Sequence, residues 1–573
     1  MRQTRHGEVG AASATGADLR ENIMVILKTQ SEFGYAPPPQ TPYSVITNIP
    51  GWDVAQAVRD GDHGPLKRVV HIYPRFAPTH FSALLGQEIA KCVGQEGKAA
   101  LVYLNPSIWP YTIRHITLES RGKHRMKSED VSLRCVDIAG HRVYTIFVEP
   151  QYMPTMMLTW QNPGLGISIR GAEHLLKGVD SIKEVSIESD VLLAPTWTPE
   201  GPAHQGIRER IVQLLQRAPL DADKVKCTPK DVFLYPTGMA AIFHSSNLLM
   251  EHRPGTIVVL GIIFHNTYHH LIEECPHGWK HFGKVDNKGL SDMEEWLEEE
   301  KKAARPVSYV FVEIPGNPTL DTPDMYRLKK LSEKYGFVLI VDDTVSGFAN
   351  IDVLPQSDFL LTSLTKSFSG QSNVMGGSVV LNPLSPKYDV LKPLFEASHH
   401  NELFASDAEV LLSNSHDFLE RTKILNRNAF AMAKFLHDAK EAPDSPIVNV
   451  QYPGLLPSKT EYDAVMRRGT SELPEPGYGC LLTVEFSDVE CAMAFYHRCG
   501  FYPSPHLGGH VTIMFAYNMV VFGKKVEERE YMRGLGVKEE SARISAGLED
   551  EGDLIDTLKD ALDAAIEVKR GSK

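Results

Sequence analysis

Residues 337–377 of the 573-residue chain read FVLIVDDTVSGFANIDVLPQSDFLLTSLTKSFSGQSNVMGG, and this stretch decides the fold. Its first residues, 337–341, are apolar and typical of a strand buried inside a sheet. Two acids, Asp342 and Asp343, stand where the apolar pattern stops. Because successive residues of a strand point to opposite faces, only one of these carboxylates can face a ligand at the strand end.

A second apolar run, 359–361, leads into hydroxyl and amine side chains, namely Ser363, Thr365 and Lys366. Serines and glycines follow as far as residue 377, and such small residues let a backbone approach a ligand closely. An acid at one strand end, with hydroxyls and a lysine after the next, suits a charged and phosphorylated aromatic cofactor. The stretch therefore predicts a site for pyridoxal phosphate.

Apolar segments earlier in the chain predict further strands at about 231–235, 256–264 and 307–314. Segments with helical spacing lie between them, which favours a mostly parallel sheet covered on both faces. Ligands of such sheets bind beyond the carboxyl ends of the strands. Three candidate residues stand at or just past these ends: Gly238, Phe264 and Asn317.

The chemistry of the predicted cofactor suggests a role for the residues around its ring. Lys366 can form a Schiff base with the aldehyde. Asp342 can keep the pyridine nitrogen protonated, and Asp343 is the competing carboxylate for that role. Phe264 can stack on the ring, and Asn317 can reach the ring hydroxyl.

The phosphate and the substrate need their own partners. We expect the phosphate to be bound by hydroxyls and by backbone amides at a helix N-terminus, from Ser363, Thr365, Gly238 and Met239. Arg543 is the candidate for the α-carboxylate of a substrate, because a planar guanidinium pairs with a carboxylate through two hydrogen bonds. Thr512 is a second candidate for a substrate contact.

Several segments of the chain together resemble the Cys/Met-metabolism family of pyridoxal-phosphate enzymes, and within it the fungal cystathionine γ-synthases. These segments are PTGMAAI (236–242), EIPGNPTL (313–320), VDDT (341–344), SLTKSFSGQSNVMGG (363–377), LGG (507–509) and RISAGLED (543–550). Three upstream segments resemble the amino-terminal extension of the fungal enzymes: PGWDVAQAVRDGD (50–62), YPRF (73–76) and WQNPGLGIS (160–168).

The resemblance implies an α/β fold of the pyridoxal-phosphate-dependent transferase type, which is aspartate-aminotransferase-like. We expect a flexible leader at 1–40, an extension domain at 41–190, a large cofactor-binding domain at 191–405 and a smaller α/β domain at 406–573. The resemblance also implies a homo-oligomer, a dimer or a tetramer, because active sites in this family form between subunits.

The resemblance further implies a transferase that replaces the γ-substituent of an O-acylhomoserine. With cysteine as the nucleophile, the product is cystathionine, as in transsulfuration and methionine biosynthesis. Three alternatives remain: a paralogue of secondary metabolism that uses another nucleophile, a γ- or β-lyase, and a catalytically silent scaffold. An intact Lys366 and Asp342 argue against the scaffold.

Two departures from the family pattern limit the inference. Phe264 stands where family members place a tyrosine that stacks on the ring, and phenylalanine cannot form a hydrogen bond through its side chain. The chain also lacks the YSRxxNPT segment that reaches the phosphate of the neighbouring subunit. Its substitute is one of two pairs, Arg208 and Arg210 or Tyr73 and Arg75, and the sequence does not decide between them.

Composition excludes several classes of protein. A net charge of −13 argues against general binding of nucleic acids or anionic membranes, and no apolar run approaches the length of a membrane span. The seven cysteines form no CxxC pair, which favours reduced thiols and a cytoplasmic location. His265 and His269 have a spacing that could bind zinc, but no further ligands accompany them, and we predict no metal.

Overall fold

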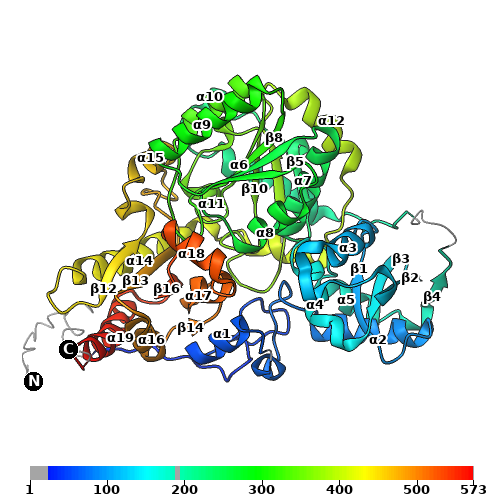
Figure 1. Ribbon diagram of the computed structural model, residues 1–573, viewed down its shortest axis with the longest axis horizontal. Helices are drawn as coiled ribbons and strands as arrows, with labels where there is room; N and C mark the ends of the chain where they lie inside the picture. The colour runs from blue at the N-terminus through cyan, green and yellow to red at the C-terminus, as the bar shows by residue number, and fades with distance from the viewer. Residues whose placement is uncertain (1–23, 63, 188–193, 572–573) are drawn as a thin grey trace, which may run out of the picture.

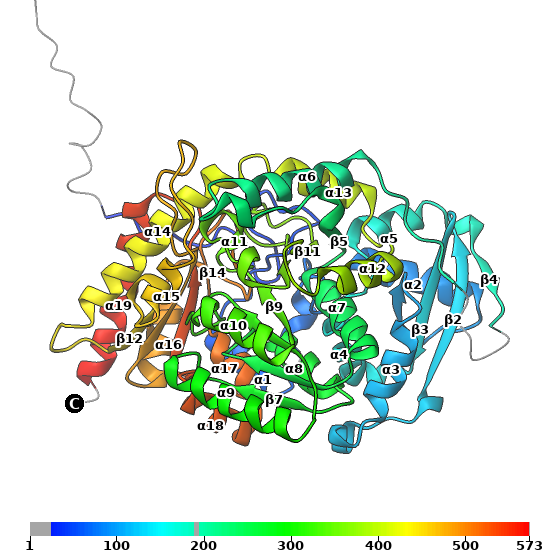
Figure 2. The same ribbon diagram turned by 90° about the horizontal axis from the view of Figure 1, so that it is seen from above.

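The computed structural model describes residues 24–62, 64–187 and 194–571, which contain three sheets. The largest sheet lies in the middle of the chain and of the molecule (Figure 1). An N-terminal sheet flanks it on one side and a C-terminal sheet on the other, as the view from above also shows (Figure 2). The fold is therefore α/β, as the sequence predicts.

The central sheet has the strand order β5-β11-β10-β9-β8-β6-β7, and only β11 runs antiparallel to its neighbours. The prediction of a mostly parallel sheet is confirmed. Its strands are β5 (Val232–Tyr235), β6 (Thr256–Leu260), β7 (Trp279–Phe282), β8 (Val307–Glu313), β9 (Val338–Asp342), β10 (Phe359–Thr362) and β11 (Gly377–Leu381).

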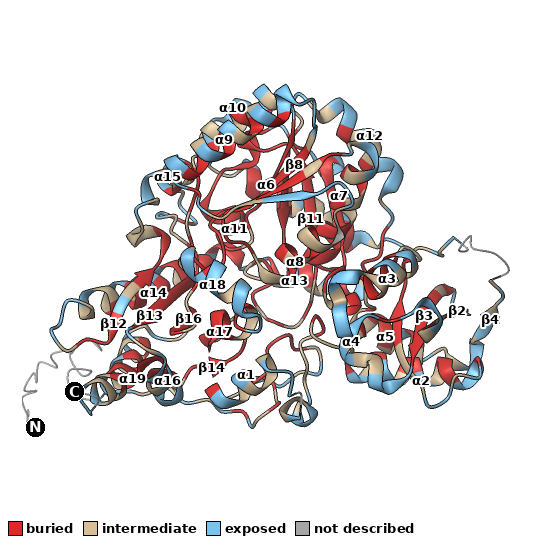
Figure 3. Cartoon of the chain, viewed as in Figure 1, coloured by how far each residue is buried: buried red, intermediate tan, exposed pale blue. Residues whose placement is uncertain are grey.

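Helices cover both faces of this sheet, and their apolar sides make the inner strands buried along nearly their whole length (Figure 3). The helices are α6 (Pro202–Gln216), α7 (Gly238–His252), α8 (His265–Glu274), α9 (Asn287–Lys302), α10 (Met325–Tyr335), α11 (Gly347–Asn350), α12 (Tyr388–Ser398) and α13 (Ala405–Asn414).

The C-terminal sheet has the order β12-β13-β16-β15-β14, with two long helices packed on each other over it. Its strands are β12 (Ile447–Gln451), β13 (Leu481–Phe486), β14 (Tyr502–Pro503), β15 (Ile513–Phe515) and β16 (Ser541–Ser545). Its helices are α14 (Phe418–Ala439), α15 (Lys459–Asp463), α16 (Val489–Arg498), α17 (Tyr517–Phe522), α18 (Val526–Gly534) and α19 (Glu551–Gly571).

The N-terminal sheet is antiparallel throughout, with the order β1-β3-β2-β4. Its strands are β1 (Ala99–Tyr103), β2 (Val131–Ile138), β3 (His141–Val148) and β4 (Lys183–Val185). Its helices are α2 (His80–Cys92), α3 (Ile108–Thr117), α4 (Met153–Gln161) and α5 (Ile169–Leu176).

The first described residues pack on the C-terminal sheet and its helices. The backbone amide of Val25 donates to Asp556 on α19, that of Leu27 donates to Thr557, and α1 (Trp52–Arg59) lies against α17. A flexible leader reaching residue 40 is therefore wrong for residues 24–40, and residues 1–23 lie outside the described part. About residues 41–72 of the predicted extension domain likewise lie with the C-terminal part of the molecule rather than with the N-terminal sheet.

No helix in the described part of the chain is both long enough and apolar enough to cross a membrane.

An ion cluster ties three parts of the molecule together. Glu273 on α8 pairs with Arg121 of the extension (2.6 Å) and with His269 (3.4 Å), which also contacts Glu528 on α18 at 2.9 Å. Burial alone would lower the pKa of His269, but the two carboxylates outweigh it and raise that pKa to about 9. His269 is therefore a structural cation here, and the described residues contain no group of three side chains able to hold a metal.

This cluster predicts a pH-dependent contribution to stability. Glu528→Gln removes one carboxylate from His269, and we expect a loss of about 1–3 kcal/mol in the free energy of unfolding near pH 6. Because the folded pKa of about 9 lies above the ordinary value of 6.5, this stability is complete below 6.5 and is lost as the pH rises through 9. Thermal unfolding of wild type and variant at about pH 6 and about pH 10 measures it. Glu527→Gln, at an exposed position of the same helix, is the control. An equal loss at both pH values would contradict the prediction.

Candidate active site

One cavity opens at the carboxyl edge of the central sheet, where the chain leaves β5, β6, β8, β9 and β10. The structure brings most of the predicted site residues to its wall: Gly238, Met239, Phe264, Asn317, Asp342, Ser363, Thr365, Lys366 and Arg543. These residues are far apart in sequence, and all except Arg543 meet because parallel strands carry their carboxyl ends to the same edge.

Lys366 lies in the turn that follows β10, with its side chain half-buried. Its amine donates to the hydroxyl of Tyr73 at 3.3 Å and lies 5.2 Å from the centre of that ring. Burial lowers the pKa of Lys366 to about 7, and the positive charges of Arg543 and Arg75 act in the same direction. A large fraction of this amine is therefore neutral at physiological pH, which a nucleophilic lysine requires.

Two carboxyls face each other across neighbouring strands. Glu313 ends β8 and Asp342 ends β9, and they are direct partners in the parallel register. Burial raises the pKa of both groups, and the charge of Asp342 raises that of Glu313 further. Asp343 lies outside the cavity and accepts a hydrogen bond from Thr362 at 2.6 Å. Asp342 is thus the cavity residue of the two adjacent acids.

The turn between β5 and α7 presents backbone amides to the cavity. Thr237 caps the helix, because its hydroxyl accepts the amide of Ala240 at 2.9 Å. A Cβ at Gly238 would lie 2.8 Å from that of Ser363, so only glycine permits this close approach. The partial positive charge of a helix N-terminus and the nearby hydroxyls form a cradle for an anion. The hydroxyl of Thr365 is engaged locally with Gly376.

Arg543 lies on β16 of the C-terminal sheet and reaches across to the central sheet. Its guanidinium donates to Asn317 at 2.9 Å and to the carbonyl of Pro505 at 2.8 Å, and it lies 3.8 Å from the ring centre of Tyr517. Burial lowers the pKa of Arg543. The cavity is therefore closed on one side by the C-terminal part of the chain.

Some candidates lie elsewhere. Thr512 is outside the cavity, and its amide and hydroxyl both donate to Glu549, at 2.6 and 2.7 Å. Arg208 pairs with Glu200, and Arg210 binds Gln213, so neither lines the cavity. Of the two pairs that the sequence left open, the structure brings Tyr73 and Arg75 to the wall beside Lys366.

Sequence reasoning overlooked other residues of this region. Glu313 and Thr267 line the cavity, and Glu313 also accepts the backbone amide of Phe264 at 2.8 Å. His506 is buried with its ring edge-on to Tyr73, at 5.7 Å between centres. The position of Glu313 at the end of an apolar run could have identified it, whereas nothing in the sequence indicates the placement of His506.

This arrangement fits pyridoxal phosphate. The cavity combines a buried amine of lowered pKa, a buried acid and an anion cradle that tolerates only glycine at one position. Together with the mostly parallel sheet, these features define a pyridoxal-phosphate-dependent enzyme.

A family model described as "Cys/Met metabolism PLP-dependent enzyme" matches residues 225–563, more than half of the chain. The chain belongs to this family. A cystathionine gamma-synthase-like enzyme of Amanita muscaria is 28% identical over 96% of this chain and 99% of its own length. An alanine racemase of Aspergillus violaceofuscus is 31% identical, and the match covers 71% of each chain.

The fold also resembles that of a solved structure. Cystathionine gamma synthase from Xanthomonas oryzae pv. oryzae shares 20% identity with this chain at a TM-score of 0.50, over 65% of this chain and 100% of that one. The predicted aspartate-aminotransferase-like type of fold is confirmed.

The lowered pKa of Lys366 predicts a distinctive reactivity in the cofactor-free protein. Acetic anhydride modifies only neutral amines, so we expect the rate at Lys366 to be half-maximal at a pH of about 7. Mass spectrometry of the Lys366 peptide, with exposed Lys230 as the reference, measures the rate against pH. A Lys366 profile that coincides with that of Lys230 would show that burial and the two arginines do not act on this amine.

Proposed function

We propose that the protein replaces the γ-substituent of an O-acylated homoserine, with cysteine as the nucleophile and cystathionine as the product. The observation that carries the proposal is the pairing, in one cavity, of a cofactor site around Lys366 with the buried guanidinium of Arg543. An amino-acid substrate needs both sites, since its carboxylate has to be held while its carbons react. The full-length similarity to a cystathionine gamma-synthase-like enzyme supports the same reaction.

The bound cofactor would supply an electron sink for the carbons of the substrate. In the proposed roles, Lys366 carries the cofactor and then moves protons at the α and β carbons, as a positioned amine of lowered pKa can. Asp342 holds the proton on the ring nitrogen, and Phe264 stacks on the ring. Asn317 reaches the ring hydroxyl and also orients Arg543, to which it is hydrogen-bonded.

The remaining proposed roles concern the two anionic groups. The amides of Gly238 and Met239, with the hydroxyls of Ser363 and Thr365, bind the phosphate. Arg543 binds the α-carboxylate of the substrate, and its hydrogen bonds to backbone carbonyls hold the guanidinium in the orientation that a two-point contact requires.

A specific observation favours a second candidate, a paralogue that uses a different nucleophile. Phe264 contributes no hydroxyl at the ring-stacking position, and its backbone amide donates to Glu313 at 2.8 Å. The side-chain contacts available to an incoming nucleophile therefore differ from those of a site with tyrosine there. The reaction chemistry at the α and β carbons would be the same in both candidates.

A product screen tests the proposed function. With O-acetylhomoserine and cysteine we expect cystathionine, measured by mass spectrometry, and little release of 2-oxobutanoate when cysteine is omitted. Lys366→Ala abolishes both the product and the borohydride-fixed cofactor on the Lys366 peptide, because the attachment point is gone. Bound cofactor without γ-replacement, but with elimination or with racemised amino acid, would overturn the assignment of the reaction.

Phe264→Tyr tests whether the ring-stacking position tunes the chemistry. A phenol can donate a hydrogen bond and assist proton transfer, steps that contribute typically 100-fold or more when well placed. We expect a change of about tenfold or more in the ratio of replacement to elimination, measured as cystathionine against 2-oxobutanoate. Phe264→Leu, which removes the aromatic ring without adding a hydroxyl, is the control. An unchanged rate and ratio in Phe264→Tyr would show that this position does not tune the reaction.

A further inference from the structure

The N-terminal extension contributes part of the cavity wall, through the YPRF segment at residues 73–76. We propose that Arg75, supplied by the same chain as Lys366, binds the phosphate of the cofactor, and that helix α4 of the extension positions it. The inference rests on the proposed function, since both concern one cofactor site. It gives the extension a direct role in cofactor binding.

The charges of the cavity point to Arg75. Three cations line the described part of the wall: Arg75, Lys366 and Arg543. Lys366 donates to Tyr73, and Arg543 is held by Asn317 and by backbone carbonyls. Arg75 is 7% exposed, and its Nη1 atom has no hydrogen-bond partner in the part of the chain that the structure describes.

An unpaired buried guanidinium is costly, and a bound anion removes that cost. Burial lowers the pKa of Arg75 to about 10, which still leaves the group charged at neutral pH. A phosphate dianion in turn needs more positive charge than the N-terminus of α7 alone provides. Arg75 and the cradle at Gly238 are therefore complementary parts of one anion site.

Helix α4 holds the segment around Arg75 on both sides. The amide of Phe76 donates to the carbonyl of Tyr73 at 2.8 Å and closes a turn. The indole nitrogen of Trp160 donates to the carbonyl of Pro74 at 2.6 Å, and the side-chain amide of Gln161 donates to that of Phe76 at 2.8 Å. The two carbonyls that flank Arg75 are thus fixed by consecutive residues of α4.

The loop after α4 contacts the second part of the anion site, the N-terminus of α7. Thr237, the cap of α7, donates its hydroxyl to the carbonyl of Gly164 at 3.0 Å. A Cβ at Gly164 would lie 2.5 Å from that hydroxyl oxygen, and its φ of +65° also favours glycine. Residues 160–164 therefore contact both the YPRF turn and the N-terminus of α7, and they set the distance between Arg75 and the cradle.

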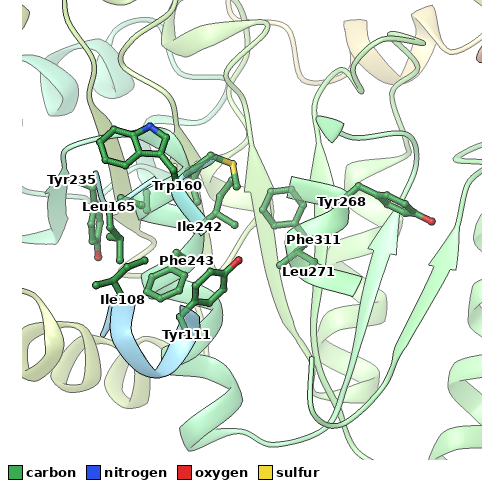
Figure 4. Close-up of a cluster of buried hydrophobic side chains, with 14 of the residues drawn as sticks. Ile108, Tyr111, Trp160, Leu165, Tyr235, Ile242, Phe243, Tyr268, Leu271 and Phe311 are labelled. Atoms are coloured by element: carbon green, nitrogen blue, oxygen red, sulfur yellow. The ribbon is translucent and has the colours of Figure 1, made fainter. Parts of the chain in front are cut away.

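An apolar core makes this connection rigid. Figure 4 shows Trp160 and Leu165 of the extension packed in one cluster with Tyr235 and Ile242 of the central part. Tightly packed side chains resist small displacements. The position of Arg75 is therefore determined by the fold of its own chain, whereas the family resemblance implies an arginine from the neighbouring subunit.

Comparison of two ligands tests the role of Arg75. Pyridoxal lacks the phosphate. Arg75→Gln should therefore weaken the binding of pyridoxal phosphate by about 30-fold or more and leave the binding of pyridoxal nearly unchanged. Dissociation constants come from fluorescence titration of the cofactor-free protein. Arg210→Gln, at the position that the structure excludes from the cavity, should leave both dissociation constants unchanged. Arg75→Lys keeps the positive charge and should lose less affinity for pyridoxal phosphate than Arg75→Gln. Equal weakening of both ligands, or no weakening, would overturn the role.

The positioning role of α4 has its own variant. Trp160→Phe removes the hydrogen bond to Pro74 and keeps most of the apolar body, so we expect the preference for pyridoxal phosphate over pyridoxal to fall by about three- to tenfold. Trp109→Phe, at a half-buried position of α3, should leave the preference intact. If Trp160→Phe lowers thermal stability but leaves the preference unchanged, α4 has only a structural role.

Co-expression of two variants, assayed at a cofactor concentration that loads the wild-type site but not the Arg75→Gln site, decides which chain supplies Arg75. In a mixed dimer of Lys366→Ala and Arg75→Gln subunits, purified through two different tags, a same-chain arginine leaves every site defective and gives no activity. An arginine from the partner would instead restore one site in two, about half of the wild-type activity per mixed dimer. Failure to recover any mixed species, with wild type eluting as a monomer, also supports the same chain.

These tests separate the inference from the proposed function. If the wild type binds no cofactor at Lys366, the proposed function fails. If the wild type binds the cofactor but Arg75→Gln keeps its preference for the phosphate, or the mixed dimer is active, only the inference fails.

Discussion

The parallel arrangement of the central strands is the constraint on which the rest of the molecule depends. Five strands with the same direction deliver their following residues to one edge, and the amine, the acids and the helix N-terminus meet there. The backbone register between β8 and β9 places Glu313 beside Asp342. No contact between the two side chains is needed for this placement. The chemistry of the cavity is thus a consequence of backbone pairing.

Burial then changes what these groups can do. In the low-dielectric interior the charged form of each group is disfavoured, so the pKa of Lys366 falls to about 7 while that of Asp342 rises to about 6. The same effect acts on Arg75, although its pKa of about 10 keeps it charged. The pKa values of the amine and of the acid are thus shifted towards neutral pH, where either group can exchange a proton. The guanidinium of Arg75 remains a fixed charge.

The sequence predicts β5, β6, β8, β9 and β10 of the central sheet, because these strands are mostly apolar and are followed by polar residues, but it does not predict β7 or β11. It does not predict how the extension contributes to the cavity. Lys366 and Tyr73 are 293 residues apart, and no spacing or periodicity connects them. The choice between Arg75 and the arginines of α6 likewise depends on packing that only the three-dimensional structure contains. The prediction of a flexible leader was wrong for residues 24–40 for a related reason, since polar and proline-rich segments can still pack when a neighbouring sheet offers edges and side chains to bind.

The proposed role of Arg75 would make the cofactor site independent of assembly. Where a partner subunit supplies a phosphate-binding arginine, the affinity for the cofactor depends on the subunit contact. Here Trp160 and Gln161 donate hydrogen bonds to the carbonyls of Pro74 and Phe76, the two residues that flank Arg75, and a shared apolar core joins the extension to the strands of the cofactor site. If Arg75 binds the phosphate as we propose, the entropic cost of ordering its side chain is met during folding of one chain, and cofactor binding need not be coupled to association.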